Sequence, residues 1–136
     1  MNSRPFSLRI FVADGDRDGL RLPAAPLLTC KGKGVVATGY KPSQVFVVTV
    51  AAQAVPQSVP SMQQYVRGMY DLRQELVAIG ALALQGNAYR FAQDYVFSAP
   101  STAAAVVSGR SANGRIEWKD AIGRTLKELQ AIEASL

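Results

Sequence analysis

The basic and amide side chains of this chain are the ones whose chemistry suits the binding of a ligand. They fall in two segments, with Lys31, Lys33 and Lys41 in the first and Arg110, Ser111, Asn113, Arg115 and Lys119 in the second. Lysine and arginine neutralise phosphates, while arginine and asparagine also form paired hydrogen bonds with guanine and adenine edges. The pattern favours a nucleic-acid site. The alternative is that these charges form solvated faces and that Asn113-Gly114 supplies a turn.

Catalytic chemistry is poorly represented in the chain. There is no histidine, the side chain that most often serves as general base, zinc ligand or triad partner. The single cysteine, Cys30, has no partner for an internal disulfide and fits a reducing compartment. Ser111 has neither histidine nor an obvious lysine base within sequence reach, so nucleophilic catalysis is not expected. We therefore expect no catalytic residue, no metal and no cofactor.

The distribution of charge favours a polyanionic partner. The chain of 136 residues carries a formal net charge of +5. No acidic residue lies between Gly19 and Tyr70, whereas Lys31, Lys33 and Lys41 all do. An unopposed basic run attracts phosphates, although a role in solubility alone is the competing explanation.

The sequence also predicts a cytoplasmic protein with no membrane partner. The longest apolar stretch, Val45 to Val55, contains Thr49 and Gln53 and falls far short of the roughly 20 residues that a membrane helix needs. The first residues, Met1 to Pro5, lack a basic and then apolar leader, so export is not expected.

The helices and strands expected from the sequence predict an α+β fold. It consists of a small antiparallel sheet covered by two longer helices and a short Ala-rich helix. Expected strands are Leu27–Cys30, Val35–Thr38, Val45–Val50, a hairpin over residues 82–91, and Tyr95–Phe97. Ser61 and Gln64 form a capping-box pattern at the start of a helix whose apolar stripe runs from Met62 to Ile79. The Ala-rich helix follows Pro100 and ends at Gly109.

The last quarter of the chain carries the second basic segment. Residues 110–114 predict an irregular loop, and Arg115 to Lys119 a strand that points Ile116 and Trp118 one way. Trp118 could stack on a base, although a lone tryptophan is more often part of the core. Thr125 and Glu128 predict a capping box for a final helix whose Leu126, Leu129 and Ile132 face the core.

The first residues predict a separate arm. Phe6, Leu8 and Ile10 alternate with polar residues and lead to Asp14-Gly15-Asp16, which indicates a strand and a turn. We expect residues 1–26 to form this arm and residues 27–136 to form a single α+β binding domain.

Three late segments carry a family resemblance. They are Asp94–Val107, Gly109–Gly114 and Glu117–Asp120, supported upstream by Thr29–Gly34 and Leu72–Leu76. Together they closely resemble an uncharacterised bacterial domain that usually ends GIY-YIG nuclease-like proteins and restriction-modification subunits. The resemblance covers roughly Leu27 to Leu129. Residues Ser7–Asp16 look like the first segment of the same nuclease-containing proteins, but no Gly-Ile-Tyr or Tyr-Ile-Gly strand follows. The resemblance thus implies that the nuclease core is missing.

A fainter likeness concerns the restriction-enzyme adenine-methylase-associated domain, which is implicated in reading modified DNA. It rests on Pro100, Ser101, the Ala run, Gly109, Asn113, Gly114 and Trp118. From both resemblances and the charge pattern we expect a non-catalytic, DNA-binding accessory module in bacterial or phage DNA metabolism or defence. The alternative is an interaction module that docks on, or inhibits, a larger nuclease or effector complex.

Overall fold

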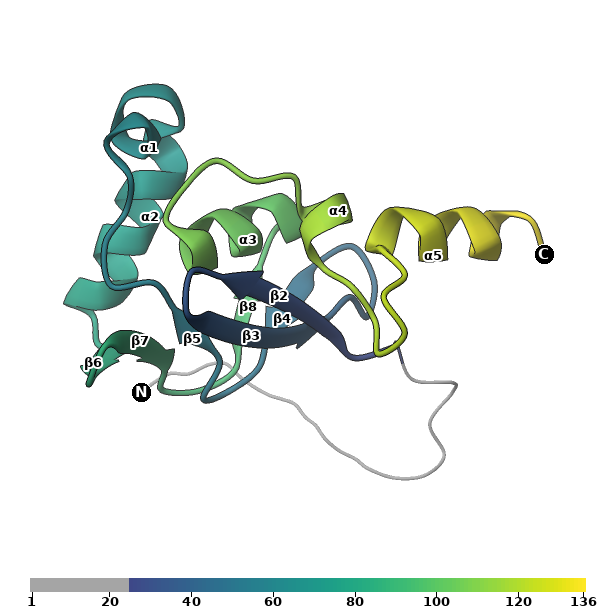
Figure 1. Ribbon diagram of the computed structural model, residues 1–136, viewed down its shortest axis with the longest axis horizontal. Coiled ribbons are helices and arrows are strands. Elements are labelled where there is room, and N and C mark those ends of the chain that lie inside the picture. Colours follow the sequence, from purple (N-terminus) through teal and green to yellow (C-terminus); the bar gives the residue numbers. More distant parts are fainter. Residues whose placement is uncertain (1–24) are drawn as a thin grey trace.

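A computed structural model describes residues 25–136 (Figure 1). The elements are β2 (Leu28–Gly32), β3 (Val35–Tyr40), β4 (Phe46–Val48), β5 (Gln53–Ala54), α1 (Pro60–Tyr65), α2 (Arg67–Ala78), β6 (Leu82–Gln85), β7 (Ala88–Phe91), β8 (Tyr95–Phe97), α3 (Pro100–Ser108), α4 (Gly114–Glu117) and α5 (Leu126–Ala134). The α+β class is confirmed. The strand expected near Phe6 and the turn after it lie outside the described residues.

The strands divide between two antiparallel sheets, where the sequence had predicted one. The first sheet has the order β2-β3-β4-β8 and the second the order β5-β7-β6. The chain leaves the first sheet after β4 at Ala51, whose φ of 71° lies in the left-handed region. The backbone N–H of Ala51 donates to the carbonyl of Phe91 at 2.9 Å, which fixes the turn against β7. This sharp turn carries no glycine, so its sequence gave no indication of it.

Helix α3 occupies the centre of the molecule. Every residue from Ala103 to Ser108 is buried, because α3 contacts β2, β4, β5 and β8 as well as α2 and α4 (Figure 1). Three consecutive alanines allow these elements to approach closely. Pro100 stands in the first turn, and Gly109 ends the helix with a φ of 67°, as the sequence predicts.

The helix expected from Ser61 to Ile79 is broken. Val66 has a φ of −133° and a ψ of 55°, which separates α1 from α2. The Ser61 capping box is also wrong, since Pro60 begins α1 and Val59 caps it without a side-chain hydrogen bond. The break divides the apolar stripe, so that Met62 is buried whereas Ile79 is 64% exposed.

The predicted strand from Arg115 to Lys119 is wrong as well. Residues 114–117 form the single helical turn α4, because the side chain of Asn113 accepts a hydrogen bond from the backbone N–H of Arg115 and caps the turn. Ile116 is therefore exposed while Trp118 is fully buried. Of this segment only Lys119 is paired, through isolated bridges to Thr29 and Thr125.

Helix α5 begins as predicted and then departs from the core. The capping box of Thr125 and Glu128 is present in full. Leu126 is buried, but Ile132, which the sequence had predicted to face the core, is 47% exposed. Figure 1 shows α5 extending away from the rest of the molecule. Among residues 25–136, no helix is long and apolar enough to cross a membrane.

Candidate nucleic-acid interface

Lys31 and Lys119 project from the same side of the first sheet. Leu28 and Cys30 of β2 are buried toward α3, so the alternating Thr29 and Lys31 face the opposite way. Lys119 pairs with Thr29, whose N–H donates to the Lys119 carbonyl at 2.7 Å and whose carbonyl accepts from the Lys119 N–H at 3.0 Å. Directly opposed residues point the same way, and diagonal neighbours such as Lys31 and Lys119 lie about 7–8 Å apart.

We define the side of the sheet opposite α3 as the outer face. It is formed by Thr29, Lys31, Val36, Thr38, Tyr40, Val96 and Lys119, as the registers of β2, β3, β4 and β8 require. Val36 and Val96 are 45% and 57% exposed. The outer face therefore presents apolar groups as well as hydroxyl groups and two lysines.

The carboxylates near this face are engaged by other groups. Asp120, next to Lys119, accepts from the backbone and side-chain nitrogens of Arg124, both at 2.8 Å. Burial raises the pKa of Asp120, but the hydrogen bonds from Arg124 and Ile122 outweigh it and lower the pKa overall. Asp94 accepts from the backbone N–H of Val50 at 2.8 Å. Within residues 25–136, neither Lys31 nor Lys119 forms a salt bridge.

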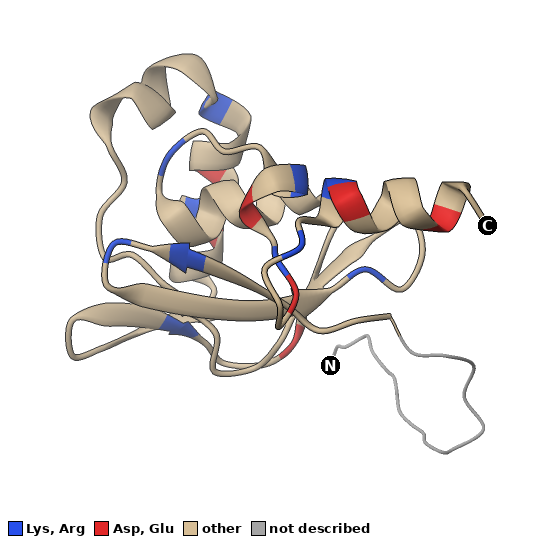
Figure 2. Ribbon diagram, turned by 45° about the vertical axis from the view of Figure 1, so that its right-hand side comes forward, with Lys and Arg blue, Asp and Glu red and all other residues tan. Residues whose placement is uncertain are grey.

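The other two lysines of the first basic segment lie at opposite ends of β3. Lys33 is exposed in the turn between β2 and β3, close to Lys31, and Figure 2 shows the two basic positions on β2 and on that turn. Lys41 follows the far end of β3, where its ammonium donates to the carbonyl of Ser43. Six residues of β3 place about 20 Å between the two ends, so Lys41 is separate from the group.

The predicted residues of the α3–α4 loop are not on the outer face. Arg110 lies 3.3 Å from the carboxylate of Glu117 and donates to the carbonyl of Ser111 at 3.1 Å. Arg115 donates to the side chain of Gln130 at 2.8 Å. Asn113 uses its side-chain oxygen to cap α4. The structure thus divides the expected site into lysines on the outer face and a second group, Arg110, Asn113 and Arg115, whose side chains form hydrogen bonds within the domain.

The buried thiol of Cys30 marks the side of β2 on which this loop lies. Burial, and after it the charge of Glu117, raises the pKa of Cys30 to about 11, while the nearby Ser108 hydroxyl and the charge of Arg110 oppose the rise. Helix α4, which ends at Glu117, contacts β2, and Glu117 holds Arg110 at 3.3 Å. In the described part of the chain, no three Cys, Asp or Glu side chains are arranged to hold a metal ion.

The residues that carry the family resemblance join α3 to α4. Gly114 donates its N–H to the Ser101 hydroxyl at 2.8 Å, and the indole N–H of Trp118 donates to the Pro100 carbonyl at 3.0 Å. The Trp118 ring packs 4.5 Å from that of Phe46. Because Trp118 is fully buried, the core interpretation is confirmed and base stacking is excluded for this side chain.

The sequence did not lead us to predict a buried arginine. Arg73 of α2 is 2% exposed and donates to the carbonyls of Val106, at 3.1 Å, and of Val55. Its guanidinium lies 5.7 Å from the centre of the Tyr89 ring. Burial lowers the pKa of Arg73, an effect that the nearby tyrosines partly offset. Its spacing of three residues from buried Leu76 was the one indication in the sequence.

Comparison with known proteins places this chain in one family. The model described as "Domain of unknown function (DUF4357)" matches residues 28–130, and the chain belongs to that family. No curated protein and no solved structure matches the chain.

Proposed function

We propose that this member of the DUF4357 family is a non-catalytic DNA-binding module. The observation that carries the proposal is the placement of Lys31 and Lys119, far apart in sequence, on one outer face whose nearest carboxylates are held by other groups. The backbone positions of Lys31 and Lys119 are diagonal neighbours about 7–8 Å apart. Their ammonium groups, which form no salt bridge within residues 25–136, can contact neighbouring phosphates of a nucleic-acid backbone. Lys33, exposed in the turn between β2 and β3, adds a third ammonium group close to Lys31.

In this proposal the module works as an accessory to an enzyme in the cytoplasm of bacteria, or in phage infection, and breaks no bond itself. The absence of histidine supports a non-catalytic role, and Cys30, the one thiol, is buried with a raised pKa. The resemblance to domains that end GIY-YIG nuclease-like proteins and restriction-modification subunits supports a partner that acts on DNA. The pure protein should not cleave plasmid DNA with any divalent metal.

Anisotropy titrations of a labelled duplex across a salt series test the binding site. Lys31→Ala combined with Lys119→Ala should weaken binding to all duplexes alike. It should also reduce the slope of log affinity against log salt by about 1.8, since each phosphate contact contributes about 0.9. Lys41→Ala combined with Lys127→Ala, the latter at an exposed position of α5, removes the same charge away from the outer face and is the matched control.

Two results would reject the proposal. The first is an equal change of slope in both double variants, which would mean that only net charge matters. The second is no binding by the unmutated chain below about 100 μM at physiological salt, a concentration at which much non-specific DNA binding is already detectable. Arg110→Ala, tested on methylated and unmethylated duplexes, reports whether the loop reads bases, because base contacts specify and phosphate contacts position.

A protein-docking module is the second candidate, and the exposed Val36 and Val96 of the outer face favour it. The partner would be a larger nuclease or effector complex that the domain positions or inhibits. An interface centred on these valines would depend little on salt, in contrast to phosphate contacts. Val96→Asp should then abolish binding while Lys31→Ala changes it little, the reverse of the result expected for DNA.

A further inference from the structure

Tyr40 is an aromatic side chain of the outer face. The strand registers pair Tyr40 of β3 with Val47 of β4, and Val47 with Val96 of β8, so the three side chains form one row across the sheet. Val47 is 7% exposed and Val96 is 57% exposed, while Tyr40 is partly exposed. The row therefore presents an aromatic ring beside an apolar surface.

The lysine nearest to Tyr40 on the outer face is in the neighbouring row. Thr29 of β2 is paired with both Thr38 and Lys119, which places these three side chains in that row. Rows lie about 7 Å apart and strands about 4.8 Å apart, so the backbone positions of Tyr40 and Lys119 are separated by about 12 Å. Stacked nucleotides rise about 3.4 Å each. A segment of about four nucleotides can therefore reach from the ring to the lysine.

The charges around Tyr40 favour phosphates on the β2 side of its ring. Burial, and after it the charge of Asp94, raises the pKa of Tyr40. Asp94 directly precedes β8, so its negative charge lies on the β8 side of the ring. On the β2 side, Lys31 and Lys119 form no salt bridge within residues 25–136. A phosphate chain is therefore attracted toward β2 and repelled from β8.

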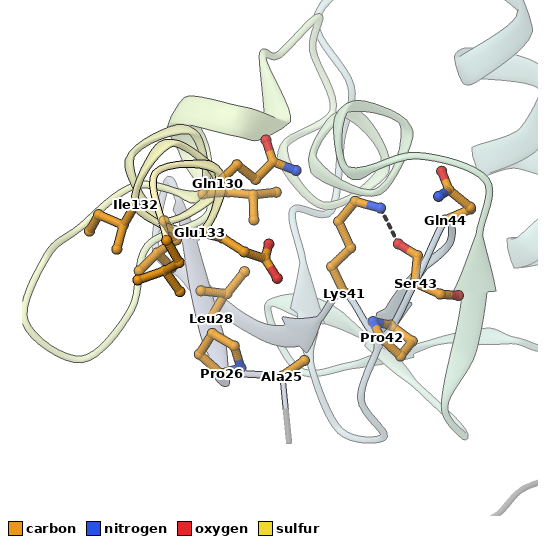
Figure 3. A pocket seen from close by; sticks show the side chains of 13 residues that line it. Ala25, Pro26, Leu28, Lys41, Pro42, Ser43, Gln44, Gln130, Ile132 and Glu133 are labelled. Atoms are coloured by element: carbon orange, nitrogen blue, oxygen red, sulfur yellow. Dashed lines mark hydrogen bonds between the residues drawn. The ribbon is translucent and has the colours of Figure 1, made fainter. Parts of the chain in front are cut away.

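Lys41, the residue after Tyr40, lies on the other side of the sheet. Figure 3 shows its ammonium directed at the carbonyl of Ser43, in a groove that Leu28 and Leu129 also line. Leu28 is buried on the α3 side of β2. The groove and the outer face are therefore on opposite sides of the sheet, and Lys41 does not contact a strand that lies over Tyr40.

We propose that the outer face binds single-stranded DNA, with an unpaired base stacked on Tyr40 and the adjoining phosphates bound by Lys119 and Lys31. The inference rests on the proposed function, since it uses the same lysines, and it adds the class of DNA. Bases inside a duplex are covered by their stacked neighbours, whereas an unpaired base can place its face on an aromatic side chain. The site should prefer single strands and discriminate little among bases, because every base has such a face.

Anisotropy titrations of a labelled oligothymidylate, alone and as a duplex with oligoadenylate, test the stacking contact. Tyr40→Leu keeps an apolar side chain beside Val47 but removes the ring. It should weaken binding of the single strand about 5- to 150-fold, the loss expected for one stacked base. Binding of the duplex should change by less than about 2-fold, because its contacts are to phosphates. Tyr40→Phe retains the ring and should bind the single strand as the unmutated chain does.

Tyr65→Leu is the matched control, since Tyr65 is 74% exposed and belongs to α1. It should leave both affinities unchanged. Photochemical cross-linking of a strand that contains iodouracil to the unmutated chain tests the same contact without a substitution. Mass spectrometry of the digested product should find the cross-link at Tyr40.

The inference is overturned if Tyr40→Leu leaves single-strand binding unchanged, if it weakens single strand and duplex equally, or if the cross-links map away from Tyr40. The proposed function would still stand in each of these cases, provided that Lys31→Ala with Lys119→Ala weakens binding of the duplex. If the unmutated chain binds neither form of DNA, the proposed function fails and the stacking site fails with it.

Discussion

Gly114→Ala should strongly destabilise the domain, although Gly114 begins a helix of a single turn and its φ is not positive. A Cβ built there would stand 2.2 Å from the carbonyl carbon of Pro100 and 2.4 Å from the backbone nitrogen of Ser101. These are backbone atoms, so no change of side-chain rotamer relieves the clash. Restoring ordinary contact requires α4 to move from the start of α3 by roughly 1 Å.

The cost of Gly114→Ala follows from the contacts that such a shift disturbs. Overpacking typically costs about 1–3 kcal/mol, and loss of the hydrogen bond from Gly114 to Ser101 adds about 1 kcal/mol. We expect a loss of about 3 kcal/mol, which for a domain of this size lowers Tm by roughly 12 °C. Circular dichroism during heating and urea titration measure both quantities.

Gly68→Ala is the control for this substitution. Gly68 lies in α2, and a Cβ there meets nothing within 4 Å. Alanine should raise stability by about 0.5–1 kcal/mol, because it is the better helix former. If Gly114→Ala melted within about 2 °C of the unmutated chain, less than the shift for 1 kcal/mol, the close packing of α3 against α4 would be refuted.

Three further outcomes are expected. Arg73→Met should lower the free energy of unfolding by about 2–4 kcal/mol in urea titrations, since it leaves two buried carbonyls without donors, and a loss below 1 kcal/mol would contradict this. Thr125→Ala should cost about 1 kcal/mol at pH 7. Hydrogen bonds from the backbone N–H and then the hydroxyl of Thr125 lower the pKa of Glu128 below its ordinary 4.5, and the variant loses only the hydroxyl's bond. The stability that this bond adds through ionised Glu128 is complete above pH 4.5 and is lost as pH falls through the lower folded value. The difference between the two proteins should therefore be smaller at pH 3. Cys30, with a pKa of about 11, should react with Ellman's reagent at pH 8 only on unfolding, whereas Cys30→Ser should still fold; rapid labelling of the native protein would disprove its burial.

Local patterns predicted those parts of the fold that local contacts determine. The α3 helix follows from its proline and glycine, and α5 begins at a capping box that is complete within four residues. The errors lie where distant contacts decide. The break at Val66 between α1 and α2 is not shown by the periodicity of the apolar residues. Helix α4 is held against the start of α3 by the hydrogen bond from Gly114 to Ser101, 13 residues away.

The candidate site was predictable in composition but not in arrangement. The basic residues stood out in the sequence, yet Lys119 reaches the outer face only through its bridge to Thr29, 90 positions earlier in the chain. Arg110, Asn113 and Arg115 looked equally suited to nucleic acid. The partners of Arg110 and Arg115, which are Glu117 and Gln130, become neighbours only in the folded chain. Asn113 instead caps α4 through the backbone N–H of Arg115, two residues on.

The two sides of β2 therefore carry different constraints. On the buried side, two hydrogen bonds join α3 to the segment of α4, from Gly114 to the Ser101 hydroxyl and from the Trp118 indole to the Pro100 carbonyl. These four residues stabilise the packing of α4 against α3. Related domains can share them for that structural reason, independently of the ligand that each domain binds. On the outer face Lys31 and Lys119 have no salt-bridge partner among residues 25–136. Under the proposed function, substitutions of the outer-face lysines should therefore alter the affinity for nucleic acid through charge without disturbing α3.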